Sequence, residues 1–162
     1  KLRNINFKIF HKKNIFSLIL IIFTFSLDRF SKIKILENLS ENNFYVNEYI
    51  NLNLIWNTGI GFGLLSMNNS IVYNLTTTII GLVIAVLLYF LFKSKKFDRI
   101  SLSLIIGGAL GNFYDRISFK AVPDFIDIHY GNFHWFIFNC ADIFITIGII
   151  FFVIGDFIKK DD

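Results

Sequence analysis

Three aspartates in the second half of this 162-residue chain have the types and spacing to do chemistry. Asp115 and Asp142 each end the same four-residue pattern, Asn-x-x-Asp, which begins at Asn112 and Asn139, and Asp124 stands between the two patterns. On a helix, this spacing places an amide and a carboxyl group on one face about a turn apart. The duplicated pattern marks these aspartates as candidates for a polar site.

A pairing of Asp124 with Asp142 would have a defined chemistry, although it requires the chain to fold back over eighteen residues. Two adjacent carboxyl groups cannot both ionise cheaply, so one keeps a proton while the other is a base, and the pair titrates as a unit. The ionised member can activate water and the protonated member can polarise a peptide carbonyl. That arrangement is typical of an aspartic protease.

The composition indicates that membrane helices position these residues. Apolar residue types make up 54% of the chain, the mean hydropathy is +0.58 and only 17% of the residues are charged. A soluble domain has about 25% charged residues. The single cysteine, Cys140, excludes a disulfide framework and a cysteine-based zinc site, and a net charge of +4 gives no continuous basic face, so we expect no nucleic-acid partner.

We predict an all-α integral membrane protein with four transmembrane helices in a single domain over residues 1–162. A span needs about 20 mostly apolar residues, and two of the charge-free runs are shorter, so their helices must extend past Asp28 and Asp115. Counting from residue 135 places Asp142 about 10 Å inside the last span. The predicted spans are residues 14–32, 70–92, 99–116 and 135–155.

The basic residues predict the orientation of these spans. Of the sixteen Lys and Arg residues, the N-terminal arm holds five, the loop after the second span four and the C-terminal tail two. By the positive-inside rule both termini are cytoplasmic, and the acidic ends of the spans lie near the outer face. A cleaved secretory signal is disfavoured because Leu27–Phe30 offers no small-residue cleavage site.

A long segment, roughly residues 33–69, follows the first span on the outer side. Polar and apolar residues alternate in Asn51–Leu54, so a short strand is expected over residues 51–57, and with it a small β-element between the first two helices. Gly59, Gly61 and Gly63 follow. They match neither the dinucleotide fingerprint nor a P-loop, so a phosphate cradle is disfavoured. A tight turn that could cover a site is favoured instead.

Five blocks of the sequence resemble, in order, the signature blocks of the lipoprotein signal peptidases, also called signal peptidase II. The blocks are Leu27–Lys32, Asn57–Gly63, Gly107–Arg116, Val122–Ile126 and Phe138–Asp142. The resemblance implies a bacterial inner-membrane aspartic endopeptidase that cuts a lipid-modified prolipoprotein on the amino side of its diacylglyceryl cysteine. It further implies membrane lipid as a partner, no cofactor and no metal, and we expect a monomer.

The resemblance also assigns site residues. Asp124 and Asp142 fall on the catalytic dyad, whereas Pro123 and Arg29 stand where the family more often has an aliphatic residue and a glutamine. The residues that fall on supporting or substrate-holding positions are Asp28, Asn57, Gly61, Asn112, Asp115, Arg116 and Asn139.

Simpler roles stay open for several of these residues. Asp115 and Arg116 also fit a capped helix end, Asp28 an interfacial helix terminus, and Asn112 a hydrogen bond between helices. Nearby, Asp127 is expected to be solvated rather than catalytic. The two histidines beside it, His129 and His134, have a spacing that is usually incidental, so we expect no metal there.

Two other classes of function use the same residues differently. A proton or ion conduit would need the acids as a relay through the membrane, whereas Asp28, Asp115, Asp124 and Asp142 gather at the outer ends of the spans. A non-enzymatic membrane scaffold would tolerate the loss of all four acids. An assay of prolipoprotein cleavage by aspartate variants separates the three.

Overall fold

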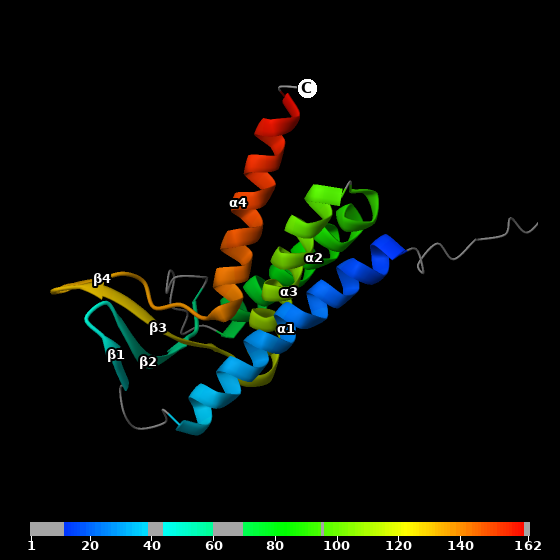
Figure 1. Cartoon of the computed structure of the whole chain (residues 1–162). Helices are drawn as coiled ribbons and strands as arrows, with labels where there is room; N and C mark the ends of the chain where they lie inside the picture. Colours follow the sequence, from blue (N-terminus) through cyan, green and yellow to red (C-terminus); the bar gives the residue numbers. More distant parts are fainter. Residues whose placement is uncertain (1–11, 39–43, 60–69, 95, 161–162) are drawn as a thin grey trace, which may run out of the picture.

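The computed structural model of the chain describes residues 12–38, 44–59, 70–94 and 96–160 (Figure 1). It contains four helices: α1 (Lys12–Asn38), α2 (Ser70–Lys93), α3 (Lys96–Phe119) and α4 (Cys140–Lys160). It also contains four strands: β1 (Phe44–Asn47), β2 (Ile50–Asn57), β3 (Val122–Tyr130) and β4 (Phe133–His134). The predicted combination of membrane helices with a small β-element is therefore confirmed.

Three of the four helices are long and apolar enough to cross a membrane, over Asn14–Asn38, Ile71–Lys93 and Cys140–Phe157. The third helix in sequence, α3, has the length but carries Asp98 and Arg99 near its start and Asp115 and Arg116 near its end. These charges lower its hydropathy. The predicted number of four spans is therefore not settled by length and composition.

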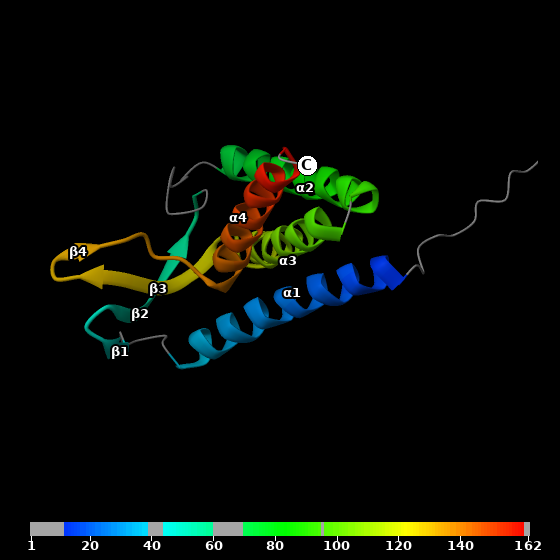
Figure 2. The same cartoon turned by 45° about the horizontal axis from the view of Figure 1, so that its top comes forward.

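The central helix of the bundle is α3, which contacts α1, α2 and α4 (Figures 1 and 2). Glycines on α3 allow this close approach. A Cβ atom added at Gly108 would lie 2.5 Å from the carbonyl oxygen of Ala141 in α4, and one added at Gly111 would overlap the Asp28 carboxylate in α1. The glycines of the third block therefore bring the ends of three helices together around one point.

An antiparallel sheet of order β1-β2-β3-β4 lies at the end of the bundle where α1 ends and α4 begins (Figures 1 and 2). The register pairs Ile55 with Asp124 and Asn51 with Asp127, and it shifts between Leu52 and Ile55. The strand predicted over residues 51–57 is confirmed as β2.

The location of the sheet is only partly as expected, because β3 and β4 come from the connection between α3 and α4. A two-stranded hairpin alone is marginally stable, and the pairing of β2 with β3 completes a sheet of sufficient size. The segment before β1 also differs, since α1 continues to Asn38 instead of ending near residue 32.

The last helix begins at Cys140, five residues later than the predicted start of its span at residue 135. The backbone of Phe138 is held by β3: its carbonyl accepts hydrogen bonds from the amides of Phe125 and Ile126, and its own amide donates to Ile126. The chain is thus extended up to residue 138. Consequently Asp142 lies in the first turn of α4, and not about two turns inside a helix that begins at residue 135.

Candidate active site

Asn139 joins the two aspartates that the sequence pairs. Its side-chain Nδ2 donates to Oδ1 of Asp124 at 2.6 Å, and its backbone amide donates to Oδ2 of Asp142 at 3.1 Å. The Asp142 amide in turn donates to Oδ1 of Asn139 at 3.2 Å. This reciprocal pair is a capping box, in which Asn139 is the N-cap of α4 and Asp142 its third residue. The Asn139–Asp142 pattern therefore fixes the Asp142 carboxylate at the start of α4 and donates a hydrogen bond to the Asp124 carboxylate.

Asp124 is buried on β3, with only 4% of its surface exposed. Its Oδ2 accepts a hydrogen bond from Nδ2 of Asn57 on β2 at 2.8 Å. Burial, together with the charge of Asp142, raises the pKa of the Asp124 carboxyl from 3.8 to about 6, and the hydrogen bonds from Asn57 and Asn139 limit this rise. The Asp124 carboxyl can therefore exchange a proton near neutral pH.

Asp142 also accepts from a third amide, because Nδ2 of Asn112 on α3 donates to its Oδ1 at 2.9 Å. The hydrogen bonds that Asp142 accepts from described residues thus come from amide groups, and no ion pair to it occurs among these residues. A carboxylate held by neutral donors keeps its basicity better than one neutralised by a cation.

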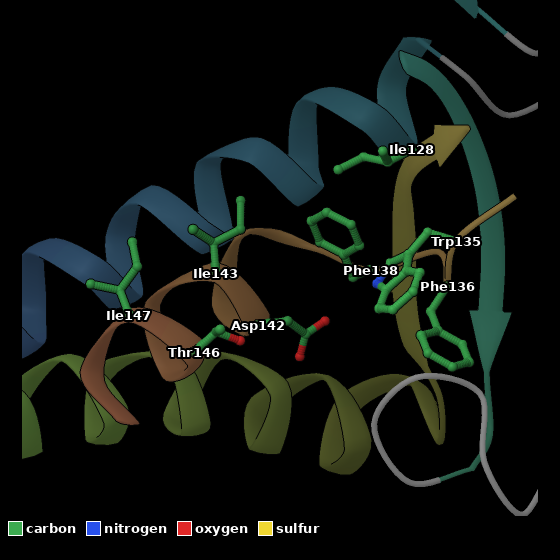
Figure 3. Close-up of a pocket in the computed structure, with 8 residues that line it drawn as sticks. All are labelled: Ile128, Trp135, Phe136, Phe138, Asp142, Ile143, Thr146 and Ile147. Carbon is green, nitrogen blue, oxygen red and sulfur yellow. The ribbon is translucent and has the colours of Figure 1, made fainter. Parts of the chain in front are cut away.

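An apolar cavity of about 450 Å³ opens beside Asp142 (Figure 3). In Figure 3 the Asp142 side chain lies between Thr146 of α4 and the aromatic side chains that precede the helix. The walls of the cavity come from β3, from the extended residues before α4 and from the first two turns of α4: Ile128, Trp135, Phe136, Phe138, Ile143, Thr146 and Ile147. A carboxylate at the edge of an apolar cavity suits a reaction on an apolar substrate.

A fully buried lysine, Lys32 of α1, is linked to Asp142 through the side chain of Asn112. Its Nζ donates to Oδ2 of Asp28 at 2.9 Å, to Oδ1 of Asn112 at 2.8 Å and to Oδ2 of Asp115 at 2.6 Å. Lys32 thereby orients the same Asn112 that donates to Asp142. Lys32 is not among the predicted site residues, although its position four residues after Asp28 places both side chains on one helix face.

Asp28 connects this lysine to the start of α4, because its Oδ1 accepts the backbone amide of Ala141 at 2.9 Å. That amide is one of the first-turn donors that have no partner within a helix. Asp115 is paired on its other oxygen with Arg29, whose guanidinium lies 4.6 Å from the ring centre of Tyr114. Asp28 and Asp115 are therefore supporting acids that fix α1, α3 and α4 together.

Arg116 and Asn57 shape the backbone next to Asp124. The guanidinium of Arg116 donates to the carbonyl of Gly59 at 2.9 Å, and Oδ1 of Asn57 accepts the Gly59 amide at 2.8 Å. These bonds orient Asn57 toward Asp124. Gly61, the remaining predicted site residue, lies outside the described residues.

The structure thus places eight of the nine predicted site residues in one hydrogen-bonded cluster at the sheet end of the bundle. One other expectation is wrong: Asp127 is not solvated but 1% exposed, and it contacts Asn53 and His134. Asp127 is buried because β2 covers it. The clustered residues are Asp28, Asn57, Asn112, Asp115, Arg116, Asp124, Asn139 and Asp142.

Comparison with known proteins identifies the family of the chain. The model of the family described as signal peptidase (SPase) II matches residues 20–158. The lipoprotein signal peptidase of Pelagibacter ubique (strain HTCC1062) is 46% identical over 151 residues, which cover 91% of this chain and 89% of that protein. The lipoprotein signal peptidase of Anaplasma phagocytophilum (strain HZ) is 40% identical over 153 residues, covering 92% and 96%.

A solved structure has the same fold. It is described as a bacterial membrane enzyme determined by the in meso method at 2.3 Å resolution. It matches with a TM-score of 0.75 at 31% identity, covering 89% of this chain and 88% of that one.

Proposed function

The chain belongs to the signal peptidase II family of membrane peptidases, and we propose from this that it removes the signal peptide from lipid-modified prolipoproteins as an aspartic endopeptidase. Cleavage falls on the amino side of the diacylglyceryl cysteine. The observation that carries the proposal is the shared hydrogen bonding of Asp124 and Asp142 through Asn139.

The mechanism follows from a carboxyl pair that holds one proton. The ionised member takes a proton from a water molecule as the water oxygen attacks the scissile carbonyl carbon, while the protonated member donates a hydrogen bond to the carbonyl oxygen. The tetrahedral intermediate then collapses with breakage of the C–N bond, and the carboxyl group that took the proton from water passes it to the leaving amine. The raised pKa of Asp124 supports this step, since a group that titrates near 6 is a better base near neutral pH than an ordinary aspartate. Asn57, Asn112 and Asn139 hold the two carboxyl groups in place throughout.

The substrate class is supported by the cavity beside Asp142. Seven of its eight lining residues are uncharged, and most are aliphatic or aromatic. An apolar signal segment or an acyl chain loses its contact with water or lipid there and gains packing contacts. The extended backbone at residues 135–138 and strand β3 flank the same cavity, which suits a peptide bound in an extended conformation.

The membrane arrangement belongs to the same proposal. Because α3 packs along the three helices of spanning length, we propose that it is the fourth span, with both termini cytoplasmic and the aspartates near the outer face of the bacterial inner membrane. The same proposal takes the active unit to be a monomer.

A reconstitution assay tests the function. The protein in detergent or proteoliposomes is incubated with a lipid-modified prolipoprotein, and release of the signal peptide is measured for wild type, Asp124→Asn and Asp142→Asn. Asp156→Asn is the matched control, because Asp156 is an exposed aspartate on α4, the helix that carries Asp142. We expect cleavage by wild type and Asp156→Asn only. Cleavage at the wild-type rate by either dyad variant would refute the assignment.

The described acids do not favour an ion conduit. Along α3 no acidic residue lies between Asp98 and Asp115, and along α4 none lies between Asp142 and Asp156. A relay through the membrane needs titratable groups at intermediate depth. The clustering of acids at one end of the bundle fits an active site and does not fit an ion-conduction path through the membrane.

A further inference from the structure

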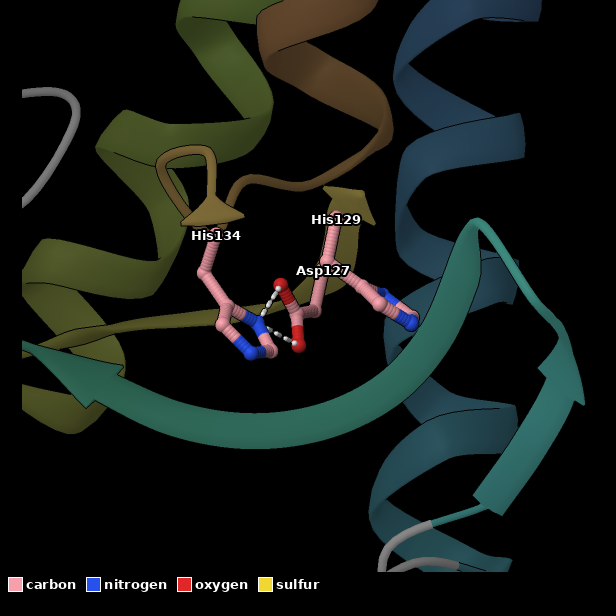
Figure 4. A group of neighbouring side chains, drawn as sticks. All are labelled: Asp127, His129 and His134. Carbon is pink, nitrogen blue, oxygen red and sulfur yellow. Dashed lines mark hydrogen bonds and ion pairs between the residues drawn. The ribbon is translucent and has the colours of Figure 1, made fainter. Parts of the chain in front are cut away.

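A second group of polar side chains lies on the opposite face of strand β3. Side chains alternate along a strand, so Asp127 and His129 share a face, while Asp124 and Ile128 point to the other. The antiparallel register of β3 and β4 places His134 directly opposite His129. One carboxylate and two imidazoles are therefore brought together by the hairpin itself (Figure 4).

The three side chains are close enough to share a ligand. One ligand atom from each of Asp127, His129 and His134 lies within 4.8 Å of the others. Nδ1 of His134 lies 3.0 Å from both carboxylate oxygens of Asp127, and the two imidazole rings are stacked with centroids 5.1 Å apart. Rotation of the half-exposed His134 can bring the ligand atoms to the spacing of about 3.3 Å that bonds of about 2.0–2.1 Å require in a tetrahedral site.

Unpaired acceptors around Asp127 are an independent observation that points to a cation. Three buried atoms, Nδ1 of His129 and Oδ1 of Asn51 and Asn53, have no hydrogen-bond partner in the part of the chain that the structure describes. Asn51 pairs with Asp127 in the sheet register, and Nδ2 of Asn53 donates to Asp127 at 2.9 Å. Buried acceptors without a donor are uncommon, and a bound cation or water accounts for them.

We propose that Asp127, His129 and His134 bind a divalent transition-metal ion of the zinc class. Two imidazoles and one carboxylate form a three-ligand set that suits borderline ions such as Zn²⁺, with a fourth position open to water. This reverses the expectation from sequence, which treated the two histidines as incidental. The ion ties β4 to β3, the strand that carries Asp124, and so stabilises one wall of the candidate active site without entering it.

Metal binding can be tested without any activity assay. The full chain is purified in detergent with its affinity tag removed, treated with a chelator and titrated with Zn²⁺, and the bound metal is counted by elemental analysis. Binding of Co²⁺ is followed separately by its visible absorption, which reports a tetrahedral nitrogen and oxygen site. We expect one Zn²⁺ per chain and an increase in Tm when it binds.

Two single-histidine variants make the test specific. His129→Gln removes a ligand whose Nδ1 makes no hydrogen bond in the described residues, so its fold should persist. Loss of second-shell partners already weakens metal sites about 10- to 100-fold, so loss of a ligand should weaken Zn²⁺ binding at least about tenfold and abolish the Tm increase. His11→Gln changes the one histidine that is outside the proposed site, and this variant should bind Zn²⁺ as tightly as wild type does.

The site would be overturned by the absence of stoichiometric Zn²⁺ on wild type, by wild-type affinity in His129→Gln, or by a loss of affinity in His11→Gln equal to that in His129→Gln. The first result would assign the unpaired acceptors to buried water. His134→Gln serves as a second ligand variant, and equal affinity there would also count against the site.

Discussion

The two Asn-x-x-Asp patterns have the same sequence form and opposite structural consequences. In Asn112–Asp115 the helix α3 continues through both residues, and the Asp115 carboxylate is neutralised by Lys32 and Arg29. In Asn139–Asp142 the pattern begins a helix, and the hydrogen bonds that the Asp142 carboxylate accepts from described residues come from amide groups. Direct pairing with a cation, and not the spacing, therefore separates Asp115 from Asp142, the acid for which we propose proton transfer.

The strongest test of this contrast measures both the cleavage rate and the Tm for a variant of each acid. Asp142→Asn should lower the cleavage rate roughly 10²- to 10⁴-fold, the usual contribution of general acid–base catalysis, with little change in Tm. Asp115→Asn should instead lower Tm, because it leaves Lys32 and Arg29 with fewer partners. Single-turnover cleavage and thermal unfolding in detergent measure the two effects. If both variants lose activity and Tm in equal proportion, the two patterns do not differ in role.

Replacing the shared cation should have the next largest effect. Lys32→Met leaves Asp28 and Asp115 buried with a lost partner, which is expected to destabilise the protein by about 3–5 kcal/mol. Lys34→Met is the matched control, since Lys34 is an exposed lysine of the same helix that pairs with Glu37 at the surface. We expect it to change stability by less than about 0.5 kcal/mol. Equal unfolding curves for the two variants would show that Lys32 is not the centre of the cluster.

Asp124 resembles Asp142 more than Asp115, and its pH dependence can show this. Its pKa is raised from 3.8 to about 6, so the native state binds this proton more tightly than the unfolded state. Its contribution to stability is full below pH about 4 and is lost as the pH rises through about 6, a change of about 3 kcal/mol. Asp124→Asn lacks this loss, so it should gain stability relative to wild type over that interval. Parallel stability curves between pH 4 and 7 would contradict the raised pKa.

Sequence reasoning named residues that the structure brings into one cluster, and it predicted less of the fold around them. The helices follow from apolar composition, and the residues of the five blocks follow from their resemblance to the signature blocks of the lipoprotein signal peptidases. The share of β3 and β4 in the sheet was missed because strand pairing is a long-range contact. The burial of Asp127 has the same origin, since its partner Asn53 lies 74 residues earlier in the chain. The start of α4 was placed too early because residues 135–138 are apolar but extended along β3.

Lys32 shows a different limit of sequence reasoning. Its positive charge counted only toward the orientation of the first span, and a lysine near a helix end usually reaches toward water. Its burial depends on three oxygen acceptors, two of which come from α3, 80 and 83 residues later in the chain. The spacing from Asp28 was the available signal, and it specifies one of the three contacts.

The smallest predicted effect concerns how α3 and α4 bring the two patterns together. Gly108→Ala places a methyl group 2.5 Å from the Ala141 carbonyl, inside the Asn139–Asp142 turn. Because backbone cannot move aside as a side chain can, the expected cost is about 1–3 kcal/mol, with a further loss of activity from displacement of Asp142. Gly81→Ala is the control, since its nearest neighbour is the Phe113 ring at 3.1 Å, which can rotate away. If Gly108→Ala keeps both wild-type Tm and wild-type cleavage, close packing of α3 on α4 does not position Asp142.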